Sequence, residues 1–397
     1  MSLVLALTLA VQKPHIVEVI APGTGRVVVQ ALVKLPEMGA ADLAKAIALK
    51  ETLLEGSRLT SRHALWAEAT HAGSPPRVIL MPDHLRIELA APPGGLSRLA
   101  RVLKGLLREP LLPPERVAHV LETLPFRRRP IWQVALWPEA GMPIKLARPE
   151  VLDLWRRAAR ADHVVLAVGG ALEPGEAERA FEGLWDRVVT APQAATPPDA
   201  QVPVRDTGTV VSVLELRGEP FSARLADLPV RILALFALGT GKTAPMTQLL
   251  REEQKLSYHQ DAVLWPHALG FQPRLLVLRR LEDQEDGMTT LAGIRRDLLE
   301  SVANWREVDR QRAVALAEST LTRGLLWNPL AFQPDGAIGR SFEDQLFLAA
   351  YWKLKTGEVL DEARLVRLMR LVRLEDLKEA AEAILANSKP IWIRGRQ

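Results

Sequence analysis

The sequence predicts an α+β protein made of two similar halves, each a sheet with helices packed on it. Its length, 397 residues, fits two domains of about 150 to 200 residues better than one. A Pro- and Ala-rich run, residues 190–208, divides the chain nearly in half. Both halves also end with the same series of segments: a run of helical periodicity, a polar break and an apolar strand that ends in glycine.

These closing segments are residues 147–170 and 371–395. The first reads ARPEVLDLWRRAARADHVVLAVGG and the second LVRLEDLKEAAEAILANSKPIWIRG. A shared pattern of about 25 residues at the ends of two halves indicates two copies of one α+β domain. We therefore expect a first domain at residues 1–192, a linker at 193–208 and a second domain at 209–397.

Other elements follow from the hydrophobic period and from β-branched content. We expect helices at residues 40–54 and 95–107, and strands at 28–35, 78–89 and 210–216. The run 230–238 is either a strand or a buried helix, because a short apolar run has no distinct period.

The composition excludes several classes of protein. Hydrophobic residues make up 48% and charged residues 25%, which is typical of a folded soluble protein. The net charge of +4 is the difference between 51 basic and 47 acidic residues, too small an excess to indicate nucleic-acid binding. The absence of cysteine excludes disulfides, thiolate metal sites and thiol nucleophiles.

The first residues leave two interpretations open. The run Ser2 to Val11 is almost wholly apolar but shorter than a membrane span of about 20 residues. It fits a signal-peptide core without the usual basic start, or a buried first strand. The protein is periplasmic or secreted if residues 1–12 are a signal remnant, and otherwise cytoplasmic. No other stretch predicts a membrane span.

The glycine-rich run Gly239–Thr243 partly matches nucleotide-binding motifs. Its end resembles a phosphate-binding loop, but Phe236 stands where that loop needs its first glycine. The run also fits the loose dinucleotide pattern, with Asp261 about twenty residues further on. A nucleotide-binding enzyme is therefore an alternative, while a glycine turn that opens a helix at Pro245 is the simpler interpretation.

Two catalytic signatures are missing. No two of the eight histidines stand three or four residues apart, the spacing that places two metal ligands on one helical face. No Gly-x-Ser-x-Gly elbow of the serine hydrolases occurs either.

The stretch Leu238–Tyr258, LGTGKTAPMTQLLREEQKLSY, resembles the C-terminal-domain signature of the insulinase, pitrilysin and mitochondrial-processing-peptidase family of zinc metallopeptidases. In that signature a glycine-rich turn leads into a helix ending in Leu-Arg-Glu, followed by Leu-x-Tyr. Residues 48–57, 106–124 and 149–170 resemble first-half motifs of the family in the same order. The resemblance implies two homologous metallopeptidase-like domains, each a mostly antiparallel sheet with packed helices.

Active members of this family carry His-x-x-Glu-His on a zinc helix, with two imidazole ligands and a glutamate base. The resemblance places Ile47, Lys50 and Glu51 at these three positions. The family's third ligand is a downstream glutamate, in the region of Glu115 and Glu122. Isoleucine has no lone pair for zinc, lysine would repel the metal and cannot act as the carboxylate base, and one glutamate alone does not make a zinc site. We therefore expect a non-catalytic member with no cofactor, and zinc only in a partner subunit.

The resemblance also implies two substrate-binding residues, Arg251 and Tyr258. An arginine donates hydrogen bonds to peptide carbonyls or a carboxylate, and a tyrosine hydroxyl donates to a developing oxyanion. Alternatively, Arg251 is a surface residue paired with Glu252 or Glu253, and Tyr258 packs on the next strand. We expect a heterodimer with a zinc-bearing homologue and a peptide substrate, or alternatively a purely structural subunit without peptide contact.

Overall fold

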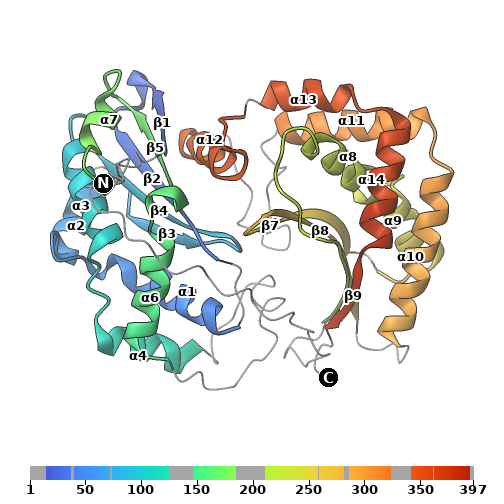
Figure 1. Cartoon of the computed structure of the whole chain (residues 1–397), viewed down its shortest axis with the longest axis horizontal. Coiled ribbons are helices and arrows are strands. Elements are labelled where there is room, and N and C mark those ends of the chain that lie inside the picture. The colour runs from blue at the N-terminus through green and yellow to red at the C-terminus, as the bar shows by residue number, and fades with distance from the viewer. Residues whose placement is uncertain are drawn as a thin grey trace, which may run out of the picture.

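The computed structural model describes residues 15–36, 40–71, 74–124, 146–184, 211–257, 259–280, 286–322, 341–360 and 362–393 (Figure 1). Within them the chain forms two sheets with packed helices, so the α+β class is confirmed. The apolar N-terminal run and the expected linker lie outside the described residues, and the domain limits stay predictions. None of the helices described is long and apolar enough to cross a membrane.

The first sheet has five strands in the order β1-β5-β2-β4-β3. The strands are β1 (His15–Ile20), β2 (Val27–Lys34), β3 (Arg77–Leu80), β4 (His84–Ala91) and β5 (Val164–Gly170). Strand β1 runs parallel to β5, and all other neighbours are antiparallel. Central strand β2 is buried along almost its whole length, as expected where both faces of a sheet are covered.

The second sheet repeats this arrangement. Its four strands are β6 (Val211–Arg217), β7 (His259–His267), β8 (Gly270–Arg280) and β9 (Lys389–Ile393), in the order β7-β8-β6-β9. All its pairs are antiparallel. Listed from its other edge, the second sheet has the order β9-β6-β8-β7. These strands follow one another in the chain, and run in the same relative directions, as β5-β2-β4-β3 of the first sheet. The duplication expected from the closing segments is therefore visible in the topology.

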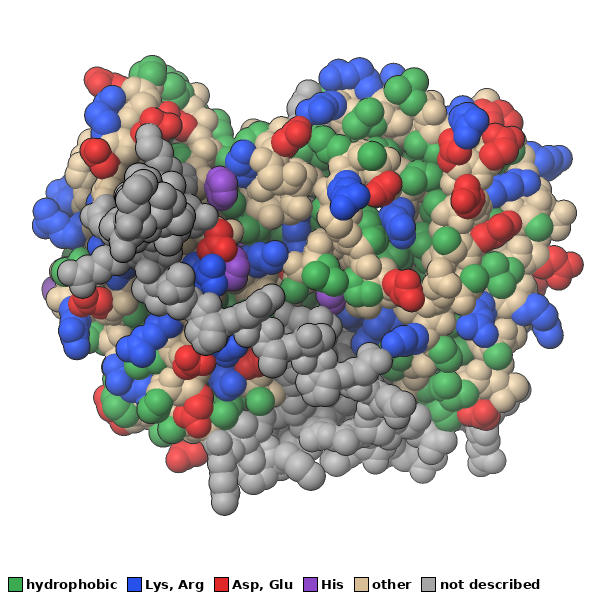
Figure 2. All heavy atoms as spheres, in the orientation of Figure 1, with side chains coloured by type: hydrophobic (Ala, Val, Ile, Leu, Met, Phe, Trp, Pro, Cys, Tyr) green, Lys and Arg blue, Asp and Glu red, His purple; other side chains and the backbone are tan. Residues whose placement is uncertain are grey.

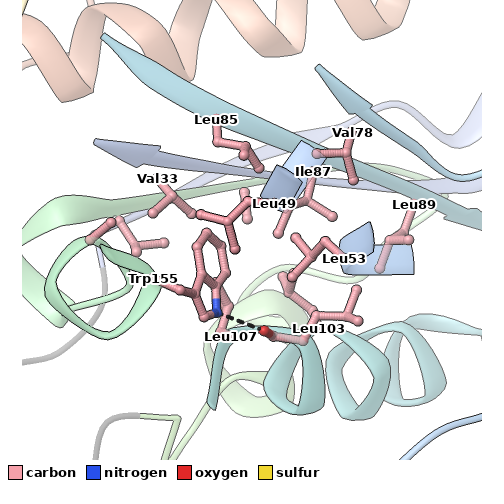
Figure 3. Close-up of a cluster of buried hydrophobic side chains, with 14 of the residues drawn as sticks. Val33, Leu49, Leu53, Val78, Leu85, Ile87, Leu89, Leu103, Leu107 and Trp155 are labelled. Atoms are coloured by element: carbon pink, nitrogen blue, oxygen red, sulfur yellow. Dashed lines mark hydrogen bonds between the residues drawn. The ribbon is translucent and has the colours of Figure 1, made fainter. Parts of the chain in front are cut away.

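Helices cover one face of the first sheet. They are α1 (Ala40–Thr52), α2 (Arg62–His71), α3 (Leu96–Arg108), α4 (Pro114–Thr123), α6 (Arg148–Ala158) and α7 (Glu176–Ala180), with short turns η1 (Pro22–Thr24), η2 (Leu53–Glu55) and η4 (Ala161–His163). Leucine and valine side chains from sheet and helices surround Trp155 (Figure 3). The Trp155 indole donates to the carbonyl of Leu106 at 3.0 Å, which satisfies its only buried polar group.

The second half contributes the remaining helices. They are α8 (Leu228–Gly239), α9 (Pro245–Thr247), the wide turn η5 (Gln248–Glu253), α10 (Gly287–Ala303), α11 (Glu307–Thr322), α12 (Phe342–Thr356), α13 (Glu362–Arg370) and α14 (Leu374–Ala386). The ambiguous run 230–238 is therefore helical. Pro229 opens α8 in the first turn, where a missing N–H costs nothing.

Helix α12 belongs to the second half in sequence but packs on the first sheet (Figure 1). Its Leu346 and Phe347 join Val28 and Leu32 of β2 in one buried cluster. A Cβ atom added at Gly169 of β5 would lie 2.6 Å from Cζ of Phe342, so the helix approaches the sheet closely. Helix α12 therefore covers the sheet face opposite α1, α3 and α6.

One expected element is different in the structure. Residues 78–89 were expected to form a single strand, but they form the hairpin of β3 and β4. Pro82 and Asp83 lie in its turn, and the Met81 amide donates to the His84 carbonyl at 2.9 Å. The single-strand prediction was wrong because the apolar residues on both sides concealed a Pro-Asp turn signal.

Candidate functional site

Helix α1 carries the three positions that the sequence assigns to a zinc helix. Ile47 is only 5% exposed and lies in the first-half core. Lys50 and Glu51 are partly exposed, and the Lys50 Nζ donates to the Glu51 Oε1 at 2.7 Å. The Lys50 ammonium thus stands where the family has its glutamate base. It also neutralises Glu51, the only one of the three residues that has a carboxylate.

Further ion pairs lie at the end of α1. Glu55 pairs with Arg62 at 3.1 Å and with Arg116 of α4 at 3.4 Å. Glu115 and Glu122 also lie on α4, and both are exposed. Across the described ranges, no three His, Asp or Glu side chains are grouped so that they could hold a metal ion. The residues on and around α1 do not fit zinc, because they offer neither imidazoles nor converging carboxylates.

Arg251 lies on η5, a single wide helical turn directly after α9. Leu250 beside it is fully buried and fixes the backbone, while the Arg251 side chain is 46% exposed. The Arg251 Nε lies 3.5 Å from Glu252 Oε1, and exposed pairs of this kind hold a side chain weakly. Wide helical turns occur frequently at functional sites, and this one presents a guanidinium at the surface.

The chain then reverses sharply into β7. The amides of Leu256 and Ser257 donate to the Leu250 carbonyl at 2.7 and 3.2 Å, and Lys255 has a left-handed φ of 53°. Tyr258, the second predicted substrate-binding residue, lies outside the described residues. The joint action of Arg251 and Tyr258 stays a prediction.

The glycine-rich run Gly239–Thr243 forms a packing turn. It follows helix α8, whereas both nucleotide motifs require a strand before the glycines. The carbonyls of Lys242 and Thr243 accept from Gln248 at 2.6 Å and from Arg312 at 2.7 Å. A Cβ atom at Gly239 would lie 2.4 Å from the Cβ of Ala262 on β7. Glycine therefore allows α8 to approach the second sheet, and the structural setting for nucleotide binding is missing.

We expect Gly239→Ala to lower the free energy of unfolding by about 1 to 3 kcal/mol, the cost of overpacking. Gly293→Ala in α10 is the matched control, because an added methyl group there meets no atom within 4 Å. It should instead stabilise the protein by about 0.5 to 1 kcal/mol through helix propensity. Urea unfolding of both variants measures the difference, and equal shifts would contradict the packing role of Gly239.

A buried polar cluster joins the two halves. It consists of Asp83 in the β3–β4 turn, His84 of β4, and Tyr351 and Lys355 of α12. Asp83 Oδ1 lies 2.8 Å from His84 Nδ1, and the Tyr351 hydroxyl donates to Asp83 Oδ2 at 3.3 Å. Lys355 forms an ion pair with the same Asp83 carboxylate.

Lys355 also holds the β7–β8 turn. Its Nζ donates to the carbonyls of His267 at 2.8 Å and Gly270 at 2.9 Å. One buried ammonium group thus connects the β3–β4 turn of the first half with α12 and the β7–β8 turn of the second. The cluster therefore links the two sheets, together with the apolar cluster that contains residues of both sheets and of α12.

The electrostatics of this cluster favour a charged Asp83–Lys355 pair beside neutral partners. Burial alone would raise the pKa of Asp83, but Lys355 and His84 hold it well below its usual range. Burial lowers the pKa of His84, which favours the neutral ring, and its Nε2 has no hydrogen-bond partner. Burial and the Asp83 charge raise the pKa of the Tyr351 hydroxyl, which stays a donor.

A second buried network lies on the face of the second sheet that is turned away from its own helices. Glu215 of β6 is fully buried and accepts two hydrogen bonds of 2.8 Å from Arg217. Arg274 of β8 lies 3.4 Å from the same carboxylate and 4.3 Å from the ring centroid of Trp265. Trp265 packs in the first-half core, so this network also reaches the boundary between the halves.

The arginines determine the protonation state of Glu215. Burial favours the neutral acid, but the charges of Arg217 and Arg274 outweigh it and lower the pKa of Glu215 from 4.5 to about 2. Burial lowers the pKa of Arg274 to about 9, so its guanidinium remains charged at neutral pH. Glu215 is therefore a permanently ionised anchor at neutral pH.

No protein-family model and no curated protein matches the sequence. Solved structures do match it. A protease from Helicobacter pylori has a TM-score of 0.71 at 11% identity, over 97% of this chain and 98% of that chain. An inactive peptidase M16 domain from Pseudomonas fluorescens has a TM-score of 0.68 at 14% identity, over 97% of this chain and 96% of that chain. The fold is that of M16 peptidases.

The periplasmic protease PqqL from Escherichia coli also has this fold, with a TM-score of 0.67 at 13% identity. The match covers 97% of this chain but 44% of PqqL, so the chain spans less than half of that protein. At such identities the likeness shows the fold alone. The insulinase-type fold expected from the sequence is thereby confirmed.

Sequence reasoning missed both buried charge networks. The only local signals were an aspartate in a turn between apolar strands and a lysine four residues after Tyr351 in an apolar helix. Neither pattern names its partner, because the Asp83–Tyr351 contact spans 268 residues of sequence. The M16 fold brings these groups together.

Proposed function

We propose that this chain is a non-catalytic subunit of an M16-type peptidase, which binds peptide and completes the chamber of a zinc-bearing homologous subunit. The observation that carries the proposal is the state of α1 within the two-domain fold. Ile47 is buried in the core and Lys50 is paired with Glu51, so the helix offers no zinc site. The role of a partner is inferred from the fold by analogy.

Two features of the second half support contact with peptide. Arg251 presents a planar set of donors at the surface, suited to carbonyl or carboxylate oxygens. Strand β7 directly follows it and is the outer strand of its sheet, with no described strand on its far side. An extended peptide can add to such an edge through backbone hydrogen bonds. At the top of Figure 2 a notch separates the first half from the region of α12 and α13, with side chains of both charges beside it.

Isolation of the tagged chain from its native cell tests the proposal. We expect a partner of similar size that carries His-x-x-Glu-His, and chelator-sensitive peptide cleavage by the complex but by neither chain alone. Stoichiometric zinc binding and peptide cleavage by the purified chain would contradict the proposal.

Within that complex, Arg251→Ala should lower kcat/KM for peptide cleavage by about 10- to 100-fold, the cost of about 1.5 to 3 kcal/mol for a lost charged hydrogen bond. Arg296→Ala is the matched control, because Arg296 is also exposed and lies beside an acidic neighbour, Asp297, at 3.0 Å. Steady-state kinetics with one peptide compares the two variants.

A purely structural subunit is the second candidate. The nearness of Glu252 to Arg251 favours it, since a local ion pair is then the whole role of the arginine. Unchanged cleavage by complexes that contain Arg251→Ala and Tyr258→Phe would support this candidate over peptide binding.

A further inference from the structure

Asp261 lies on β7, three residues after Tyr258. Side chains alternate between the two faces of a strand. Ala262 and Leu264 pack in the second-half core, whereas Val263 and Trp265 pack against the first-half core. Asp261 shares the face of Val263 and Trp265, so its carboxylate lies on the side of the sheet that is turned toward the first half.

Among the residues that the structure describes, none supplies a counter-charge to the Asp261 carboxylate. No described side chain forms an ion pair with it, in contrast to Glu215 on the same face, which has two arginines. Leu276 is its direct cross-strand neighbour, and Val263 follows on the same face. Burial raises the pKa of Asp261 to about 6, opposed only by the Ala262 amide. A carboxylate among apolar neighbours is costly unless a cation pairs with it.

The register of the hairpin shows which backbone groups face outward. His267 and Gly270 close a two-residue turn, and the amides of this pair point toward each other. The same holds for every second pair further along the hairpin, including Asp261–Leu276. The amides of Gln260, Ala262 and Leu264 then face the outer edge, where the Ala262 amide also hydrogen-bonds the Asp261 carboxylate. The backbone nitrogen of Pro266 also faces the outer edge, so its missing N–H removes no hydrogen bond between β7 and β8.

A peptide strand paired antiparallel along this edge would place one residue directly opposite Asp261. The two residues would form a non-hydrogen-bonded pair, with Cβ atoms about 4.5 to 5.5 Å apart on the same face. The carboxylate is then within reach of the long side chain of that residue. Lysine and arginine are the peptide residues that carry a permanent positive charge at neutral pH.

We propose that Asp261 binds a basic side chain, lysine or arginine, of an extended peptide that lies along the outer edge of β7. The inference rests on the proposed function and adds a substrate preference to it. A charge-assisted hydrogen bond to a partly desolvated carboxylate is stronger than one in water, so it selects for charge as well as for shape.

Two matched peptides test the inference. One is a fluorescein-labelled extended peptide rich in Thr and Val with a single lysine, and its twin has norleucine at that position. Fluorescence anisotropy with the full-length chain at pH 7.5 measures both affinities. We expect the lysine peptide to bind about 10-fold more tightly, a ratio typical of a charged hydrogen bond. In Asp261→Asn the ratio should fall to about 1.

Glu300→Gln is the matched control, because Glu300 is an exposed carboxylate on α10, away from β7, and should leave the ratio unchanged. Asparagine keeps the shape of Asp261 and removes a half-buried charge that has no ion-pair partner among the described residues, so we expect Asp261→Asn to fold. Equal binding of both peptides by the unaltered chain would overturn the role of Asp261 and leave the proposed function standing. Binding of neither peptide would overturn both.

Discussion

Replacing Asp83 by asparagine is expected to lower the free energy of unfolding by about 3 to 5 kcal/mol, because it leaves the buried Lys355 ammonium without its counter-charge. Asparagine keeps the shape of the side chain, so the loss reports charge and not packing. Urea unfolding at pH 7 measures the effect. Asp153→Asn is the control, since the exposed Asp153–Arg157 pair contributes less than about 1 kcal/mol.

A double-mutant cycle separates the pair from its surroundings. Lys355→Met alone should also be strongly destabilising, because it strands the Asp83 carboxylate. The double variant should be more stable than the sum of the two single effects predicts, by about 1 to 3 kcal/mol. Strict additivity would contradict a direct Asp83–Lys355 interaction.

Asp83→Asn should also loosen the packing of helix α12 on the first sheet. Tyr351 and Lys355 both reach Asp83 from this helix, so the loss of its charge weakens two contacts of α12 with the first sheet. Hydrogen exchange of α12 amides should become faster in Asp83→Asn, while α10, which has no contact with the cluster, should change little.

Acid should destabilise the protein through Glu215 over a defined range. The folded pKa of Glu215 is depressed from 4.5 to about 2, so its contribution is fully present above pH 4.5 and is lost as the pH falls toward 2. A shift of this size corresponds to about 3 kcal/mol, at about 1.4 kcal/mol for each pKa unit. Glu215→Gln should be less stable than the unaltered chain at pH 7 by a similar amount.

The difference in free energy of unfolding between the unaltered chain and Glu215→Gln should decrease steadily below pH 4.5. Denaturant unfolding at pH 7, 5, 4 and 3 measures it, with Glu300→Gln as the exposed-carboxylate control. A difference that stays constant over this range would show that Glu215 stabilises the fold through shape and not through its ionised form.

The sequence by itself determined the α+β class, the two similar halves and the lack of histidine at the two zinc-ligand positions, Ile47 and Glu51, with Lys50 in place of the base. These features are local. Hydrophobic periods predict helices and strands, a Pro- and Ala-rich run predicts the linker between the halves, and a side chain without a lone pair cannot bind zinc wherever it lies.

Only the tertiary structure decided the assignment of residues 230–238 to a helix and of residues 78–89 to a hairpin. It also decided that α12 covers the sheet of the other half, and that Asp83 and Lys355 are buried together. The physical reason is that the cost of burying a charge depends on the partner that faces it. The partners of Asp83 and Glu215 come from separate segments of the chain, and the lack of a described partner for Asp261 is equally invisible in a local pattern.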